Sequence, residues 1–159
     1  DNEKVHTQTL AAMSPASDSY EDIFAVIRRL NLPYEDTRQQ YLRMVFNVIA
    51  RNVDDHSKNF SFCMNRNGAW RLSPAYDLTY SVDLTAPAYS NRHSLTVNGK
   101  NEEFTRGDLE PIGQNNDIQD YNTLIDAVTN AIAKFELYAK ELDIDEKLIK
   151  SIQADFIKV

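Results

Sequence analysis

A chain of 159 residues has the length of one ordinary domain, and its 42% apolar and 26% charged residues are typical of a folded globular protein. These proportions exclude a disordered or fibrous chain. No apolar run approaches the roughly 20 residues that a membrane-spanning helix needs, and no secretory signal is visible, so we expect a cytoplasmic protein without membrane contact. The single cysteine, Cys63, excludes an intramolecular disulfide and a thiolate metal cluster.

The net charge of −7 is spread unevenly along the chain. Residues 1–80 contain nine Lys or Arg and ten Asp or Glu, whereas residues 81–159 contain eight and fourteen. Because nucleic-acid backbones are bound by clustered Lys and Arg, we expect no direct contact with DNA or RNA. The chain starts at Asp1 and not at Met, so we expect one domain, residues 1–159, cut from a longer protein.

The first half of the chain predicts two helices before a polar loop. Residues 20–30 follow a Ser- and Asp-rich start and place apolar side chains at helical spacing. After Pro33, a second predicted helix has a wide apolar face that is typical of a buried element. Its apolar residues are Tyr41, Leu42, Val45, Phe46 and Ile49. This helix leads directly into the sequence NVDDHSKN, residues 52–59.

A β-hairpin follows the polar loop. Residues 60–64 and 69–72 are short apolar runs on either side of NRNG, and Asn-Gly between two such runs is a strong hairpin signal. Pro74 ends the second strand, which places Asp77 in the loop beyond it. Residues 79–93 predict a surface loop, and residues 93–100 predict another short strand and turn.

The second half predicts helices again. Residues 105–113 predict a short helix bounded by Pro111 and Gly113, followed by one long amphipathic helix from about Tyr121 to Leu142. A final helix is predicted within residues 143–159. The fold class expected from these elements is mainly α with small β-hairpins, that is, α+β.

The polar loop has the spacing of a phosphoryl-transfer site. A polar turn at a helix end often has only a capping role. Protein kinases, however, use a catalytic-loop Asp, an Asn five residues later, and a further Asp that binds Mg²⁺. Here Asp54 and Asn59 are five residues apart, and Asp77 lies just past the following hairpin. The spacing therefore favours a kinase-type site.

The sequences DDHSKNFSF and WRLSPAYDLTYS resemble the carboxy-terminal domain of the HipA family of bacterial serine/threonine kinases, the toxins of HipA/HipB-type toxin–antitoxin systems. HTQTLAAM, HSLTVNGK and FTRGDL extend the resemblance over nearly the whole chain. The resemblance implies a protein-kinase-like C-terminal lobe that uses ATP and Mg²⁺. It also implies Asp54 as the catalytic base and Asn59 and Asp77 as residues that bind Mg²⁺ and hence the nucleotide.

The same resemblance implies macromolecular partners. One is a protein substrate phosphorylated on a Ser or Thr hydroxyl, and aminoacyl-tRNA synthetases are among the family's targets. The other is a small DNA-binding antitoxin of the HipB type, so that any connection with DNA would be indirect. Nothing in these residues selects one substrate.

Other residues of the loop have open roles. His56 stands where protein kinases usually have Lys, and the D-x-H-x-x-N pattern is similar to that of phosphatidylinositol 3-kinase-like proteins. The His56 side chain could contact the transferred phosphate or only brace the loop. Lys58 could neutralise phosphate charge or pair with Asp55, which we do not expect to be the base. We expect His6 and His93 to be structural or surface residues.

A nucleotide-gripping region is not visible in the sequence. There is no G-x-G-x-x-G pattern, so we expect the isolated chain to transfer phosphate poorly or not at all. Two alternatives stay open. One is a two-metal phosphohydrolase that uses the Asp-Asp-His sequence and a distant Asp. The other is a non-catalytic docking module.

Overall fold

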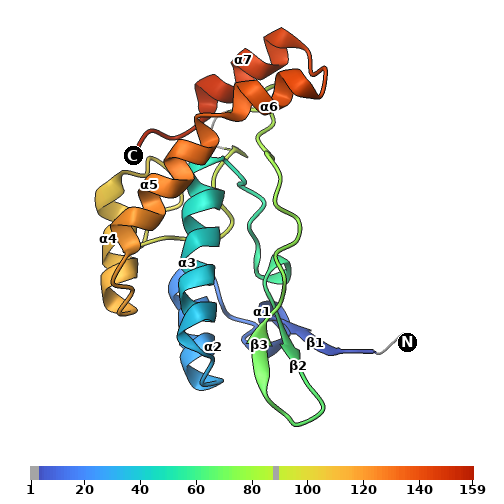
Figure 1. The fold of residues 1–159 in the computed structure, drawn as a ribbon, viewed down its shortest axis with the longest axis vertical. Coiled ribbons are helices and arrows are strands. Elements are labelled where there is room, and N and C mark those ends of the chain that lie inside the picture. Colours follow the sequence, from blue (N-terminus) through green and yellow to red (C-terminus); the bar gives the residue numbers. More distant parts are fainter. Residues whose placement is uncertain (1–3, 88–89) are drawn as a thin grey trace.

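The computed structural model describes residues 4–87 and 90–159, which form a set of helices with one small sheet at one end of the molecule (Figure 1). The strands are β1 (His6–Thr9), β2 (Ser61–Met64) and β3 (Trp70–Leu72). The helices are α1 (Leu10–Met13), α2 (Tyr20–Arg29), α3 (Tyr34–Ile49), the 3₁₀ turn η1 (Ser57–Asn59), α4 (Arg106–Asn115), α5 (Tyr121–Ile132), α6 (Phe135–Glu141) and α7 (Glu146–Asp155). The expected α+β class is confirmed.

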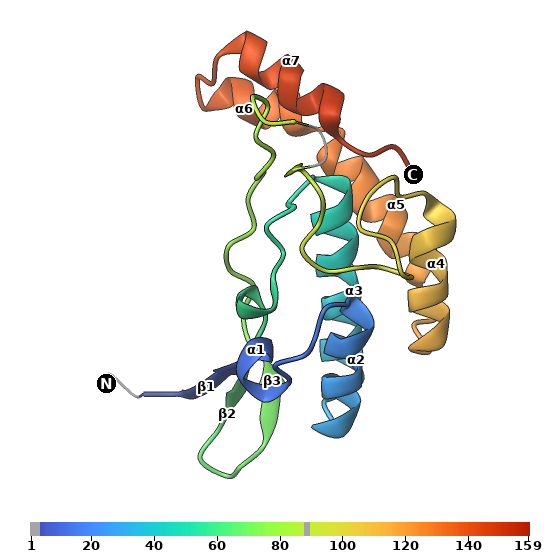
Figure 2. The same ribbon diagram turned by 180° about the vertical axis from the view of Figure 1, so that it is seen from behind.

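Helix α3 is the centre of the core, and α2, α4 and α5 lie beside it (Figure 2). Of the apolar residues that predict this helix, Tyr41, Val45 and Ile49 are buried, and Leu42 and Phe46 are partly buried against the core. The neighbouring helix α2 begins with a capping box, in which Ser19 and Asp22 bond to each other's backbone amides. The two helices before the polar loop are thus those that the sequence predicts.

The sheet is antiparallel with the order β1-β2-β3. The predicted hairpin is present as β2 and β3, with Phe62 opposite Leu72 and with Gly68 at a φ of 80° in the turn. Strand β1 was not predicted, because it gains its hydrogen bonds from β2, more than fifty residues later. The strand predicted within residues 93–100 is wrong, since only isolated bridges form there, but the turn exists at Asn98 and Gly99, both with positive φ.

Two predicted helix boundaries in the second half are also wrong. Helix α4 continues through Pro111 to Asn115. The carbonyl that loses its partner there belongs to Gly107, which is exposed and can bond to water, while buried Leu109 and Ile112 hold the helix in place. The single long helix is in fact α5 and α6, separated at Ala133 and Lys134.

Helices α6 and α7 pack against each other as a helical hairpin (Figure 1). This hairpin lies beyond the C-terminal end of α3, at the end of the molecule opposite the sheet. Phe135, at the start of α6, packs edge-on against Phe156 with a centroid distance of 5.1 Å. The chain then returns to α3, where the amide of Ile157 donates to the carbonyl of Ile49 at 3.1 Å. In the described part of the chain, every helix is too short or too polar to cross a bilayer.

Candidate functional site

Two loops carry the predicted site residues and run beside each other (Figure 2). Loop A, residues 50–60, connects α3 to β2, and loop B, residues 73–81, follows β3. The backbone joins them near both ends. The amide of Ser73 donates to the carbonyl of Ser61 at 2.9 Å, and that of Ser81 donates to the carbonyl of Arg51 at 3.3 Å. The hairpin therefore returns loop B to loop A, as the position of Asp77 in the sequence predicts.

Asp54 and Asn59 are brought together within loop A. Nδ2 of the Asn59 side chain donates to the backbone carbonyl of Asp54 at 2.9 Å, across the single turn of η1. The Asp54 side chain is 63% exposed, and its Oδ1 lies 3.7 Å from Nε2 of His56. Within residues 4–87 and 90–159, no protein hydrogen bond reaches the Asp54 carboxylate or Oδ1 of Asn59. The Asp54 carboxylate can therefore accept a proton, and both groups can bind a cation.

Asp77 is held in loop B by its backbone and leaves its side chain free. Its φ is 54°, a left-handed conformation that Asp tolerates better than most residues. Its carbonyl accepts a hydrogen bond from Nδ2 of Asn52 at 3.1 Å. Among the described residues, no donor is bonded to the Asp77 carboxylate. An exposed carboxylate on a constrained backbone is the arrangement expected of a ligand for a cation.

Tyr76 braces the two loops next to Asp77. Its hydroxyl donates to the carbonyl of Lys58 at 2.7 Å and lies 2.6 Å from Oγ of Ser61. Asn59 and Asp77 line a common small pocket of about 10 Å³, enough for one water molecule or one ion. Buried Arg43 of α3 also lines this pocket, a contribution that the apolar pattern of α3 did not indicate.

Lys58 and Asp55 do not pair, so one of the two roles left open for Lys58 is wrong. The Lys58 side chain is exposed, whereas Asp55 is completely buried and is bonded to other groups. Its carboxylate accepts from Oη of Tyr20 at 2.7 Å and from the amide of Ser94 at 2.8 Å. Asp55, which we did not expect to be the base, is thus held inside the protein.

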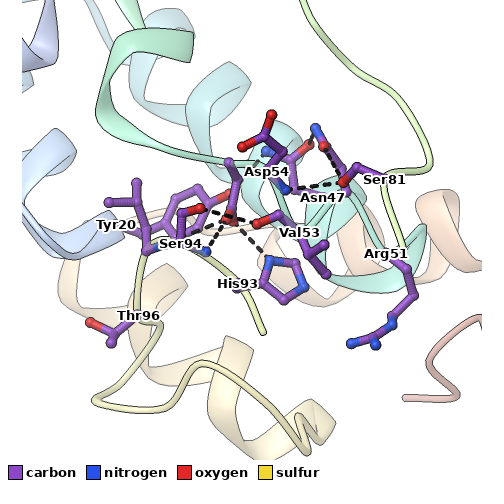
Figure 3. Close-up of polar contacts among 12 residues, drawn as sticks. Tyr20, Asn47, Arg51, Val53, Asp54, Ser81, His93, Ser94 and Thr96 are labelled. Carbon is purple, nitrogen blue, oxygen red and sulfur yellow. Dashed lines mark hydrogen bonds and ion pairs between the residues drawn. The ribbon is translucent and has the colours of Figure 1, made fainter. Parts of the chain in front are cut away.

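His93 is the further partner of Asp55 and was not connected with the loop by sequence reasoning. Its Nδ1 lies 2.8 Å from Oδ2 of Asp55, and neither side chain is exposed (Figure 3). Its ring packs edge-on against Phe104 at 5.2 Å. The expectation of a structural histidine is confirmed for His93. Burial, and then the Asp55 charge, raise the pKa of Tyr20 well above its ordinary value, so Tyr20 stays a donor.

The C-terminal helix reaches both loops through one carboxylate. Oδ2 of Asp155 accepts from Nε of Arg51 at 3.1 Å and from the Tyr80 hydroxyl at 3.2 Å. Arg51 lies three residues before Asp54, and Tyr80 lies three residues after Asp77. The sequence does not indicate this contact, because Asp155 is 104 residues from Arg51 and 75 residues from Tyr80 and no local pattern connects them.

A binding site made of several protein ligands is not present in the described parts of the chain. No group of three or more His, Cys, Asp or Glu side chains there is arranged to hold a metal ion. Asn59 and Asp77 supply one amide oxygen and one carboxylate. Mg²⁺ is commonly bound by one or two carboxylates together with phosphate oxygens and water. The oxygen donors present therefore fit a Mg²⁺ ion that is shared with a phosphorylated ligand.

The described residues form an α+β domain in which Asp54, Asn59 and Asp77 lie on two adjacent loops. Residues 2–155 match the HipA-like C-terminal domain, and the chain belongs to this family. It is also 31% identical over 70 residues to a Sinorhizobium fredii protein named "Putative kinase Y4mE". That match covers 43% of this chain and 16% of the relative.

Proposed function

We propose that this chain is the protein-kinase-like catalytic lobe of a longer HipA-type kinase, which transfers the terminal phosphoryl group of ATP to a Ser or Thr hydroxyl of a protein. The observation that carries the proposal is the arrangement of the two loops. They bring Asn59 and Asp77 to one pocket, and they leave the Asp54 carboxylate exposed on loop A, where the Asp54 backbone carbonyl accepts from Asn59.

Each residue has a separate role in this proposal. Asn59 and Asp77 would hold Mg²⁺, which neutralises charge on the transferred phosphate. Asp54 would orient the attacking hydroxyl and accept its proton. His56, whose Nε2 is 3.7 Å from Asp54, would keep that carboxylate in place, and exposed Lys58 would approach the phosphate.

The shared pocket is far too small to enclose a nucleotide. We therefore infer that most nucleotide contacts come from another part of the longer protein. The proposal also includes two partners. One is a protein substrate, for which an aminoacyl-tRNA synthetase is a candidate, and the other is a HipB-like antitoxin. The phosphohydrolase alternative is not favoured, because Asp55 of its Asp-Asp-His sequence is completely buried and bonded to Tyr20 and Ser94.

The test is transfer of labelled phosphate from Mg²⁺-ATP by the full-length parent protein. We expect Asp54→Ala and Asp77→Asn to reduce transfer by at least about 100-fold while the fold is retained. The control is Glu141→Gln, which neutralises an exposed carboxylate on α6 and should transfer like the wild type. A parent protein without transfer, or an Asp77→Asn variant with full transfer, would refute the proposal.

A further inference from the structure

A row of five hydrogen bonds runs from the backbone amide of Asp54 to the side chain of Asp55 (Figure 3). The backbone between these two adjacent residues closes the row into a ring. We call it the Asp55 ring. It passes in order through the Asp54 amide, Ser81, Asn52, Asn47, Tyr20 and the Asp55 carboxylate. The successive distances are 3.0, 3.2, 3.1, 2.9 and 2.7 Å. The ring thus connects loop A, loop B, α3 and α2.

All five bonds of the Asp55 ring point in the same direction. The Asp54 amide can only donate, and an ionised Asp55 carboxylate can only accept, so the two ends determine which way the groups between them are turned. Ser81 donates to Asn52, Asn52 to Asn47, and Asn47 to Tyr20. Hydrogen bonds in such a row polarise and strengthen one another.

The direction of the ring decides one contact in the candidate site. Nδ2 of Asn52 donates both to Asn47 and to the backbone carbonyl of Asp77, at 3.1 Å in each case. If the amides were reversed, Asn52 would turn its oxygen toward the Asp77 carbonyl. Two acceptors at that distance repel each other, and the bond between loop A and loop B would be lost.

We propose that Asp55 is a positioning residue: its carboxylate, anchored by His93, sets the direction of the ring and so holds the Asp77 backbone beside Asp54. The amides of Ser94 and Leu95 donate to its second oxygen at 2.8 and 3.4 Å. Nδ1 of His93 is the donor at 2.8 Å to the oxygen that also accepts from Tyr20. Asp55 never touches a substrate and acts through the two loops.

The anchor is firm because the His93 segment is attached on its other side to α2. The amide of Tyr20 donates to the carbonyl of Thr96, and the amide of Thr96 donates to the carbonyl of Asp18, each at 2.9 Å. Asp55 therefore joins loop A to α2 and to the His93 segment, and these two are also bonded to each other. If an amide replaces this carboxylate, its NH2 donor must face either Tyr20 and His93 or the backbone amides of Ser94 and Leu95.

The test compares Asp55→Asn with Asp36→Asn, measured by amide hydrogen exchange and NMR. Asp36 is the matched control, because it is also a buried carboxylate bonded to side-chain and backbone donors but lies outside the ring. We expect Asp55→Asn to speed exchange of the Asp54 and Ser81 amides about tenfold or more and to shift the Asn52 side-chain amide resonances. Asp36→Asn should leave both unchanged, and Val128 in α5 should stay protected in either variant.

A milder pair of variants keeps the test decisive if Asp55→Asn unfolds. Tyr20→Phe removes two bonds of the Asp55 ring, the one to Asp55 and the one from Asn47. Tyr41→Phe removes a bond to the Leu109 carbonyl from an equally buried side chain. Faster exchange at Asp54 in Tyr20→Phe alone supports the proposal. Equal exchange in the two Tyr variants, or no change at Asp54 in Asp55→Asn, overturns it.

The effect on activity rests on the proposed function and is measured separately. In the full-length parent protein, Asp55→Asn should lower kcat about 100-fold, since small displacements of catalytic groups have effects of that size. If the parent transfers no phosphate but the exchange result holds, the proposed function fails and the positioning role stands. If activity falls without a change in exchange, the positioning role fails instead.

Discussion

The contact of Asp155 with both loops predicts that Asp155→Ala destabilises the protein noticeably. The variant removes the hydrogen bonds from Arg51 and Tyr80. The Arg51 and Asp155 side chains are 14% and 30% exposed, so solvent screens the pair only in part. A hydrogen bond to a charged group contributes about 1.5–3 kcal/mol, and the partial exposure argues for the lower end of this range. We expect a loss of about 2 kcal/mol in the free energy of unfolding.

The loss should be limited because apolar contacts also attach the C-terminal segment. Phe156 packs edge-on against Tyr80 and Phe135, and the amide of Ile157 bonds to Ile49. Urea unfolding measures the change, and for a chain of this length it corresponds to roughly 4–8 °C in Tm. The control is Lys150→Ala, which removes an exposed pair with Glu146 on the same helix and should cost below about 0.5 kcal/mol. Equal losses in both variants would refute the reasoning.

Two further predictions concern stability. Burial opposes ionisation of Asp36, but the bonds from Arg71 and from the Leu72 amide outweigh burial, and the pKa of Asp36 is lowered. A lowered pKa stabilises the fold above the ordinary Asp value of about 3.9 and loses that effect as pH falls below it. Asp36→Asn should therefore lower the urea midpoint at pH 7 and have a much smaller effect near pH 3; an equal effect at both would contradict the assignment. Gly113→Ala should destabilise by about 1–3 kcal/mol despite the better helix propensity of Ala, because its Cβ would lie 2.5 Å from Cβ of Tyr121. Gly107→Ala on the same helix, with only Thr105 Oγ1 at 3.7 Å, should be neutral or stabilising, and calorimetry giving both variants the same sign would count against this packing.

Local sequence determined the elements that depend on near neighbours. The two helices before loop A follow from apolar spacing, and α2 also has capping residues at Ser19 and Asp22. The β2–β3 hairpin follows from Asn67-Gly68, because Gly adopts positive φ without strain. The spacing of Asp54, Asn59 and Asp77 also indicated that the hairpin returns Asp77 to loop A. These features need only a few residues on either side to be recognised.

Other boundaries could not be read from periodicity. The apolar pattern continues from α5 into α6, so the break at Ala133 and Lys134 leaves no mark in the sequence. What selects it is the packing of Phe135 against Phe156, twenty-one residues later. Pro111 predicted an end to α4, but a buried face and an exposed carbonyl at Gly107 allowed the helix to continue.

The sequence by itself thus indicated the α+β fold class and predicted Asp54, Asn59 and Asp77 as the candidate site, because both predictions rest on local spacing. Only the tertiary structure decided what holds those residues in place. Asp55 is a polar residue beside Asp54 in the sequence, and its burial against Tyr20 and His93 appears only when segments 35 and 38 residues away meet it. Hydrogen bonds between distant segments depend on the packing of the whole core, and no local pattern records them.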